Sequence, residues 1–393
     1  MPVTIGVPRE TFPGERRVAL IPRGCEALAK LGASVVVEQS AGADAGFPDD
    51  QYAARGARLA SRSDVFSQSD LIVQVRSLGA NPDAGRADLG LLRSGQVLVG
   101  FGEPLTAAQE IPELARAGVS YFSMELMPRI TRAQSMDALS SMATIAGYRA
   151  VLLAATTLPK MFPMLMTAAG TVTAARAFIL GAGVAGLQAI ASARRLGAVV
   201  SAYDIRSAVK EQIESLGAKF VVLNIEAGGS EDKGGYAKAM GDEFYRRQRE
   251  LLKEVLREQD VVITTAAVPG QKAPILITRD MAEALQPGSV IVDIAAERGG
   301  NCELTQAGQT VKHNGVTILG PVNLPSTVPY HASQMYSSNV VSFLKLMVNK
   351  GELAINREDE IIRETLVTSG NEVVNTRVIE RLGLAPVPSG QGR

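Results

Sequence analysis

The sequence predicts an α/β protein built from two doubly wound domains, and three observations carry this prediction. The chain has 393 residues, more than the roughly 250 to 300 at which a single hydrophobic core stops growing. Short β-branched runs alternate with Ala- and Leu-rich segments of helix length, which indicates parallel strands joined by crossover helices. Gly181, Gly183 and Gly186 follow one of these strands with the spacing G-x-G-x-x-G.

The composition shows no strong charge bias. Lys and Arg together number 40, as do Asp and Glu, so nothing favours nucleic acid or an anionic membrane surface as a partner. The opening residues M-P-V-T-I-G-V-P-R-E predict a strand rather than a signal peptide, and we expect no apolar run of about 20 residues that could span a membrane. Cys25 and Cys302, with two histidines in the chain, are expected to be structural thiols without a metal site. The expected location is cytoplasmic, without direct membrane insertion.

The first half of the chain is expected to form one α/β domain. Its predicted strands are Thr4–Val7, Ser34–Glu38, 71–75, 97–101 and 121–124. No glycine fingerprint follows any of them, so we expect this half to form one wall of a cleft. A helix-like segment over 329–349 is expected to run back to it. The predicted domains are therefore 1–134 with 329–393, and 135–328.

Polar residues are concentrated between the two predicted domains, in the segment 127–151. If a helix begins near Ser135, then Gln134, Asp137 and Ser140 or Ser141 fall on one helix face, with Arg129 and Arg132 just before it. These side chains could form a binding surface. The alternative is a solvated helix start, with Ser135 as N-cap and Asp137 complementing the helix dipole.

The glycine turn lies in a context typical of a dinucleotide-binding fold. A strand over 178–180 leads into it, a helix over 184–196 leaves it, and a second strand over 199–203 ends at Asp204. Gly181 permits the tight turn, Gly183 lets backbone approach a pyrophosphate, and Gly186 lets helix and strand pack closely. This pattern predicts a Rossmann-like second domain that binds a dinucleotide.

Asp204 indicates which dinucleotide is bound. Its carboxylate is expected to accept hydrogen bonds from the adenosine ribose and to repel a 2′-phosphate, so we predict NAD(H) rather than NADP(H). Arg206 is the one feature that favours NADP(H). A βαβ unit that binds nothing would also fit the pattern. A membrane span over 177–193 does not fit, because the stretch is shorter than about 20 residues and holds glycines, Gln188 and Ser192.

The rest of the second domain is predicted to complete its sheet. The predicted elements are a helix over 208–216, a helix over 243–259, and strands over 219–223, 260–266, 289–294 and 317–319. The glycine-rich loop 224–244 is longer than the roughly 2 to 6 residues usual for such connections. We interpret it as a mobile lid, with a surface insertion as the alternative.

Several motifs together resemble one known family. The motifs are R-I-T-R-A-Q-S-M-D, G-A-G-V-A-G-L-Q-A-I-A, G-G-Y-A-K-A-M-G-D-E-F and P-G-S-V-I-V-D-I-A-A-E-R-G-G-N-C. They are similar to the NAD(H)-binding part of the alpha subunit of proton-translocating NAD(P) transhydrogenase, and the similarity runs nearly end to end. The resemblance implies two domains around a deep cleft, a homodimer, and hydride transfer from NADH to NADP⁺ on a separate subunit. A membrane-spanning subunit would couple this transfer to proton movement and hold the chain at the inner face of the cytoplasmic membrane.

The resemblance also implies roles for individual residues. Arg129, Gln134, Asp137 and Ser140 would meet the nicotinamide and its ribose. The adenosine and pyrophosphate would be lined by Val184, Asp204, Ile205 and Arg206, with Gly235, Gln248 and Ala267 nearby and Tyr236 on the lid. Ring-to-ring hydride transfer requires orientation but no proton donor, so we expect the polar residues to position the ring.

Two other functions remain open at this point. Alanine dehydrogenase resembles the chain at E-R-R-V-A-L (15–20), but that family holds and protonates its substrate with a lysine and a histidine. The corresponding stretches here place Arg76 nearest the lysine and have no histidine in V-G-F-G-E-P (99–104). A non-catalytic NAD(H)-sensing module would carry the same glycine fingerprint.

Overall fold

The computed structural model describes residues 2–223, 242–268 and 270–384. The chain divides into two compact units, Met1–Met142 with Ser326–Arg393, and Ala143–Pro325. The functional domain boundaries predicted after residues 134 and 328 stay a prediction. Each unit is described here by itself.

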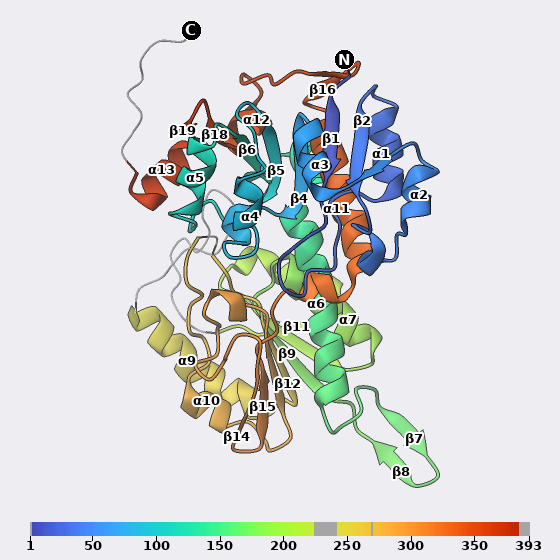
Figure 1. Ribbon diagram of the computed structural model, residues 1–393. Coiled ribbons are helices and arrows are strands. Elements are labelled where there is room, and N and C mark those ends of the chain that lie inside the picture. The colour runs from blue at the N-terminus through green and yellow to red at the C-terminus, as the bar shows by residue number, and fades with distance from the viewer. Residues whose placement is uncertain (1, 224–241, 269, 385–393) are drawn as a thin grey trace. The chain divides into compact units, whose positions relative to one another are not determined.

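The first unit contains an eight-stranded sheet in the order β19-β18-β6-β5-β4-β1-β2-β3 (Figure 1). Its strands are β1 (Thr4–Val7), β2 (Ser34–Glu38), β3 (Arg58–Ala60), β4 (Leu71–Arg76), β5 (Val97–Phe101), β6 (Ser120–Ser123), β18 (Leu366–Ser369) and β19 (Glu372–Val373). The first six run parallel with the doubly wound order 3-2-1-4-5-6. β18 and β19 add an antiparallel edge, which the sequence pattern did not predict.

The helices of the first unit include two whose ends follow recognisable sequence rules. The helices are α1 (Pro22–Ala29), α2 (Asp49–Ala53), α3 (Arg62–Gln68), α4 (Arg86–Leu89), α5 (Glu110–Arg116), α11 (Pro329–Leu344), α12 (Glu360–Thr365) and α13 (Thr376–Leu382). Pro329 occupies the first turn of α11, where its missing N–H costs nothing. Asn375 caps α13, which ends at left-handed Gly383.

The second unit contains a seven-stranded sheet in the order β11-β10-β9-β12-β13-β15-β14. Its strands are β9 (Arg176–Leu180), β10 (Val199–Tyr203), β11 (Lys219–Phe220), β12 (Val261–Thr264), β13 (Val290–Asp293), β14 (Thr310–His313) and β15 (Val316–Leu319). All pair in parallel except β14, an antiparallel edge strand. The α/β class with two Rossmann-like, doubly wound domains is thereby confirmed.

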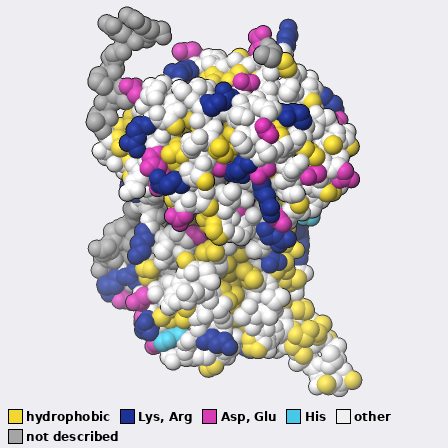
Figure 2. Space-filling view, viewed as in Figure 1, with side chains coloured by type: hydrophobic (Ala, Val, Ile, Leu, Met, Phe, Trp, Pro, Cys, Tyr) yellow, Lys and Arg dark blue, Asp and Glu magenta, His cyan; other side chains and the backbone are white. Residues whose placement is uncertain are grey.

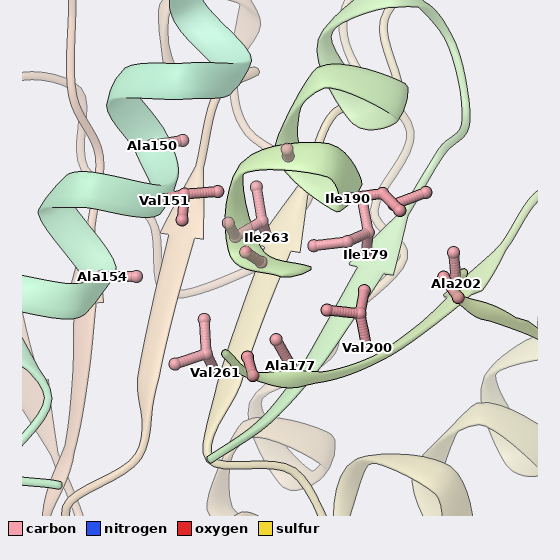
Figure 3. Close-up of a cluster of buried hydrophobic side chains, with 14 of the residues drawn as sticks. Ala150, Val151, Ala154, Ala177, Ile179, Ile190, Val200, Ala202, Val261 and Ile263 are labelled. Carbon is pink, nitrogen blue, oxygen red and sulfur yellow. The ribbon is translucent and has the colours of Figure 1, made fainter. Parts of the chain in front are cut away.

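β-branched side chains explain why the central strands of this sheet form where they do. β12 and β13, V-V-I-T and V-I-V-D, are buried along their whole length, as expected for strands covered on both faces. Four helices accompany them: α7 (Val184–Arg195), α8 (Lys210–Ser215), α9 (Asp242–Leu256) and α10 (Arg279–Glu283). Small and branched side chains of the long helix α6 complete one face of the core (Figure 3): Ala150, Val151 and Ala154 with Ala177, Ile179, Val261 and Ile263.

Helix α6 (Ala138–Thr157) corrects one expectation. Its 20 residues include a window with a mean hydropathy of 1.4, so by length and composition it could cross a membrane. The sequence led us to expect no such stretch, because small residues, hydroxyl groups and Arg149 break up the apolar pattern. Core helices of globular domains pass the same test, and Ala150, Val151 and Ala154 are fully buried in the core of the second unit.

A two-stranded hairpin was also not predicted. β7 (Leu165–Thr167) and β8 (Gly170–Val172) pair with each other and are exposed along their whole length (Figure 1). Apolar side chains nevertheless gather on it and on the residues before it. Met166 is 81% exposed and Met164 is 60% exposed (Figure 2).

Candidate functional site

The glycine turn between β9 and α7 gives each glycine a different task. Gly181 has φ +98°, a conformation that a side chain would strain. A Cβ on Gly186 would lie 1.9 Å from the carbonyl oxygen of Gly181, so only glycine lets α7 approach the strand this closely. A Cβ on Gly183 would meet no atom within 4 Å. The turn is therefore tightly packed at one glycine and open at another.

The N-terminus of α7 begins at this open glycine. Gly183 is the N-cap, and no side chain among the described residues caps the helix. The first N–H groups of a helix have no partner within it and carry positive potential, which suits a phosphate group. Gly147 of α6 lets the backbones of the two helices meet here, because a Cβ on it would lie 2.1 Å from the Ala185 carbonyl oxygen. Val184, the first residue of α7, is 40% exposed beside the open position.

Asp204 follows β10 and is buried in a set of hydrogen bonds. Its Oδ2 accepts from the Ala182 N–H at 2.7 Å, which ties the carboxylate to the glycine turn. Its Oδ1 accepts from the Arg206 N–H at 2.8 Å and from the Arg206 Nε at 2.9 Å. A further Arg206 nitrogen donates to Oδ2 at 2.9 Å. Arg206, the feature that favoured NADP(H), is thus paired with the carboxylate that favours NAD(H).

The other predicted residues of the second unit lie on neighbouring elements. Ile205 packs against the core beside β10. Gln248 of α9 is 1% exposed and donates to the Tyr203 hydroxyl at 3.0 Å. Its Oε1 has no hydrogen-bond partner within the described residues. Ala267 is exposed just after β12. Gly235 and Tyr236, with the loop interpreted as a lid, lie outside the described residues.

These features fit a dinucleotide. The space above Gly183 is a cradle that a side chain would fill, and the N-terminus of α7 opens on it. Gln248 adds a buried amide oxygen without a partner in the part of the chain that is described. Because a buried polar atom is costly to leave unpaired, a bound molecule is one natural partner for it.

In the first unit, the predicted polar residues do not all lie on one helix, contrary to the expectation. Thr131–Met136 forms a 3₁₀ helix, and α6 begins only at Ala138. The residue that caps α6 is Asp137 and not Ser135: its Oδ1 accepts from the Ser140 N–H at 2.9 Å, and its Oδ2 accepts from the Ser140 Oγ at 2.5 Å. A carboxylate three residues before a free helix N–H outcompetes continued helix, which the periodicity argument overlooked. Arg129 and Gln134 remain exposed.

Nearby contacts hold this segment in place. Arg132 forms a two-pronged ion pair with Asp359, at 2.6 and 2.9 Å. Asn339 of α11 donates to the Ser135 carbonyl oxygen at 2.9 Å. No sequence signal pointed to Asn339, because it lies 204 residues further along the chain.

A buried ion-pair cluster at the carboxyl ends of β1 and β4 was only partly foreseen. Arg17 donates to the Glu15 carboxylate through Nε at 2.7 Å and through a terminal nitrogen at 2.6 Å, and Arg76 Nε adds a contact at 3.2 Å. Burial opposes ionisation of Glu15, but the charge and hydrogen bonds of Arg17 outweigh it and lower the pKa of Glu15 to about 2. Burial and the Glu15 charge raise the pKa of Glu10 to about 8. Both arginines are therefore occupied by a carboxylate of the chain itself.

Comparison with known proteins places these features in a family. Residues 6–146 match the family described as alanine dehydrogenase/PNT, N-terminal domain, and residues 150–376 match its C-terminal domain. The chain is 44% identical over 392 residues to an NAD(P) transhydrogenase subunit alpha protein of Rhodospirillum rubrum, covering 99% of each chain.

Solved structures agree with this assignment. "The crystal structure of transhydrogenase from Sinorhizobium meliloti" superposes with a TM-score of 0.84 at 45% identity, covering 94% of this chain and 100% of that one. An L-alanine dehydrogenase structure has a TM-score of 0.81 but only 26% identity, covering 97% and 99%. The chain therefore belongs to the alanine dehydrogenase/PNT family, on the branch of the NAD(P) transhydrogenase alpha subunits.

Proposed function

We propose that this chain is the NAD(H)-binding component of a proton-translocating NAD(P) transhydrogenase. The observation that carries the proposal is the glycine turn of the second unit, which is open at Gly183 and linked to Asp204 through the Ala182 N–H. The 44% identity to a transhydrogenase alpha subunit over nearly the whole chain supports the reaction class. In this role NADH supplies the hydride, and NADP⁺ on a partner subunit receives it.

The residues of this chain would bind and orient the nucleotide. The N-terminus of α7 and Gly183 would hold the pyrophosphate. Asp204 would accept the adenosine ribose hydroxyls. All four of its acceptor positions are already used by Ala182 and Arg206, so binding would exchange some of the Arg206 hydrogen bonds for ribose hydroxyls. Val184, Ile205, Gln248 and Ala267 would line the adenosine and pyrophosphate.

The polar residues near the start of α6 would orient the nicotinamide ring. We assign this role to Arg129, Gln134, Asp137 and Ser140, with Asp137 and Ser140 already fixed by their capping hydrogen bonds. Hydride transfer between two nicotinamide rings depends on apposition and orientation in dry surroundings, and neither ring needs a proton. Rigid orienting groups suit this reaction better than a mobile acid or base.

Reconstitution tests the proposal directly. The purified chain is mixed with the NADP(H)-binding subunit and the membrane-spanning subunit, and NADH-dependent reduction of NADP⁺ is followed. We expect hydride transfer only when the partner subunits are present. Asp204→Ala should abolish NADH binding, whereas Asp137→Asn should keep binding and slow hydride transfer. Full hydride transfer by Asp137→Asn, with binding lost in Asp204→Ala, would show that the positioning role is wrong.

The alanine dehydrogenase alternative is weaker on the structure. Arg17 and Arg76 both bind the Glu15 carboxylate, so neither is free to hold a substrate carboxylate. The loop after β5 offers Glu103 where that family needs a histidine. Assaying alanine with NAD⁺ at alkaline pH decides between the two enzymes, since appreciable turnover would refute the proposal. NADH binding without hydride transfer to any partner would instead favour an NAD(H) sensor.

We also propose a homodimer that is peripheral to the cytoplasmic membrane through its partner subunits. The exposed hairpin β7–β8 supports the dimer, because Met164 and Met166 at 60% and 81% exposure form an apolar surface that water disfavours. A second copy of the chain is the proposed occupant of this surface.

A further inference from the structure

One motif of the second unit has no assigned role so far, namely V-D-I-A-A-E-R-G-G-N-C at the end of β13. Asp293 closes the strand, is fully buried, and accepts hydrogen bonds from several donors that follow it. The N–H groups of Asn301 and Cys302 donate to its Oδ2 at 2.7 and 3.0 Å, and the Thr305 Oγ donates to the same oxygen at 2.7 Å.

The glycine pair of this motif makes the arrangement possible. Gly299 and Gly300 have φ values of +93° and +79°, which glycine adopts without strain. A Cβ on Gly300 would lie 2.8 Å from the Asp293 Oδ2. The chain therefore folds back tightly on Asp293 and delivers Asn301 to a fixed position.

Asn301 in turn binds the loop that follows β12. Its Oδ1 accepts from the Ala266 N–H at 3.0 Å, and its Nδ2 donates to the Ala266 carbonyl oxygen at 2.8 Å. The same Nδ2 donates to the Pro274 carbonyl oxygen at 2.9 Å. The backbone carbonyl of Asn301 accepts from Leu276 and Ile277 at 2.8 and 3.0 Å. Both backbone groups of Ala266 are thus held by one side chain, directly before exposed Ala267.

The braced loop is also attached to the glycine turn. The Thr265 N–H donates to the Leu180 carbonyl oxygen at 2.9 Å, and the Thr265 Oγ donates to the Gly181 carbonyl oxygen at 3.0 Å. The hydrogen bonds therefore run from Asp293 through Asn301 and Ala266 to the turn that opens at Gly183. The position of Ala267 beside that turn depends on every link.

We propose that Asn301 is a positioning residue for the nucleotide site, and that the Asp293–Asn301 pair braces the β12 loop so that Ala267 and the glycine turn are preformed for the dinucleotide. This inference rests on the proposed NAD(H) binding by the second unit. Preforming a binding loop removes the ordering cost from the binding step, so the brace contributes affinity without touching the ligand.

The test compares Asn301→Asp with a matched control in the first unit. Asn301→Asp keeps the shape but places an oxygen against the carbonyl oxygens of Ala266 and Pro274. Asn375 is a buried asparagine of the same kind, which donates to the Glu364 and Leu366 carbonyl oxygens at 2.9 and 3.2 Å. Asn375→Asp therefore reports the general cost of such a change. Two quantities are measured: amide hydrogen exchange at Ala266 without nucleotide, and the Kd of NADH by fluorescence titration.

We expect faster exchange at Ala266 and roughly tenfold weaker NADH binding for Asn301→Asp, which corresponds to one or two lost hydrogen bonds. Asn375→Asp should bind NADH like the wild type, and hydride transfer by Asn301→Asp at saturating NADH should stay near the wild-type rate. Unchanged exchange at Ala266, unchanged NADH affinity, or an equal loss of affinity in both variants would overturn the inference.

Two further outcomes are separated by the design. If Asn301→Asp does not fold, Thr305→Val removes one donor to Asp293 and is expected to raise exchange at Ala266 and weaken NADH binding about threefold; no change in either would also overturn the inference. If the wild-type chain binds no NADH, the proposed function fails and the role in nucleotide binding fails with it. The exchange measurement then still decides whether Asn301 holds the loop.

Discussion

Gly183→Ala is the sharpest perturbation of the proposed nucleotide site. Gly183 has φ −73° and ψ −171°, a conformation open to any residue, and the added Cβ would meet no protein atom within 4 Å. Alanine is a poorer N-cap than glycine by roughly 0.5 to 1 kcal/mol, but it lowers the entropy of the unfolded chain by a similar amount. The free energy of unfolding should therefore stay within about 1 kcal/mol of the wild type.

NADH binding should respond quite differently to the same methyl group. The space beside Gly183 is where the pyrophosphate must approach the backbone N–H groups of α7, and a methyl group there keeps the phosphate from hydrogen-bonding distance. Losing one or two charge-assisted hydrogen bonds, at about 1.5 to 3 kcal/mol each, weakens binding by at least tenfold. The measurement is a fluorescence titration with NADH, together with thermal unfolding followed by circular dichroism.

Gly186→Ala is the matched control, because it adds the same methyl group inside the protein rather than in the open space beside Gly183. Its Cβ would lie 1.9 Å from the Gly181 carbonyl oxygen, and backbone cannot move aside cheaply. Overpacking of this kind costs about 1 to 3 kcal/mol, partly offset by the better helix propensity of alanine. We expect lost stability in Gly186→Ala and lost binding in Gly183→Ala. Wild-type NADH affinity in Gly183→Ala would refute the assignment of this space to the pyrophosphate.

Three further predictions concern other parts of the chain. Asp204→Ala should weaken NADH binding by more than about tenfold and cost about 3 to 5 kcal/mol of stability by leaving buried Arg206 unpaired; adding Arg206→Met should restore stability but not binding, and recovery of both would contradict the ribose role. Glu10 has a pKa raised to about 8 from an ordinary value of 4.5, so its contribution to stability is complete below pH 4.5 and is lost as pH rises towards 8. Glu10→Gln should remove a slope of about 1.4 kcal/mol per pH unit in that window, measured by denaturant unfolding of the chain across pH, and an unchanged slope would show that Glu10 does not titrate there. Met166→Glu should shift the chain to the monomer in light scattering without changing NADH affinity, and a persistent dimer would place the interface elsewhere.

Much of the fold could be predicted because local rules decide it. β1, β2, β5 and β10 begin and end at the predicted residues, since each is a β-branched run bounded by turn residues. The antiparallel edge strands β14, β18 and β19 were missed, because short edge strands carry little hydrophobic pattern. The start of α6 was misplaced by about three residues, because a cap at Asp137 depends on one side-chain hydrogen bond and not on periodicity.

The sequence by itself determined the dinucleotide turn, because glycine at three spaced positions is a local requirement of backbone geometry that no distant residue can replace. Only the tertiary structure decided which partner each polar group has. It paired Arg206 with Asp204, occupied Arg17 and Arg76 with Glu15, and set Asn301 against the loop after β12. Those contacts join segments as many as 61 residues apart in the chain. Hydrogen bonds between such segments leave no periodic trace in sequence, because their geometry exists only after the sheets have formed.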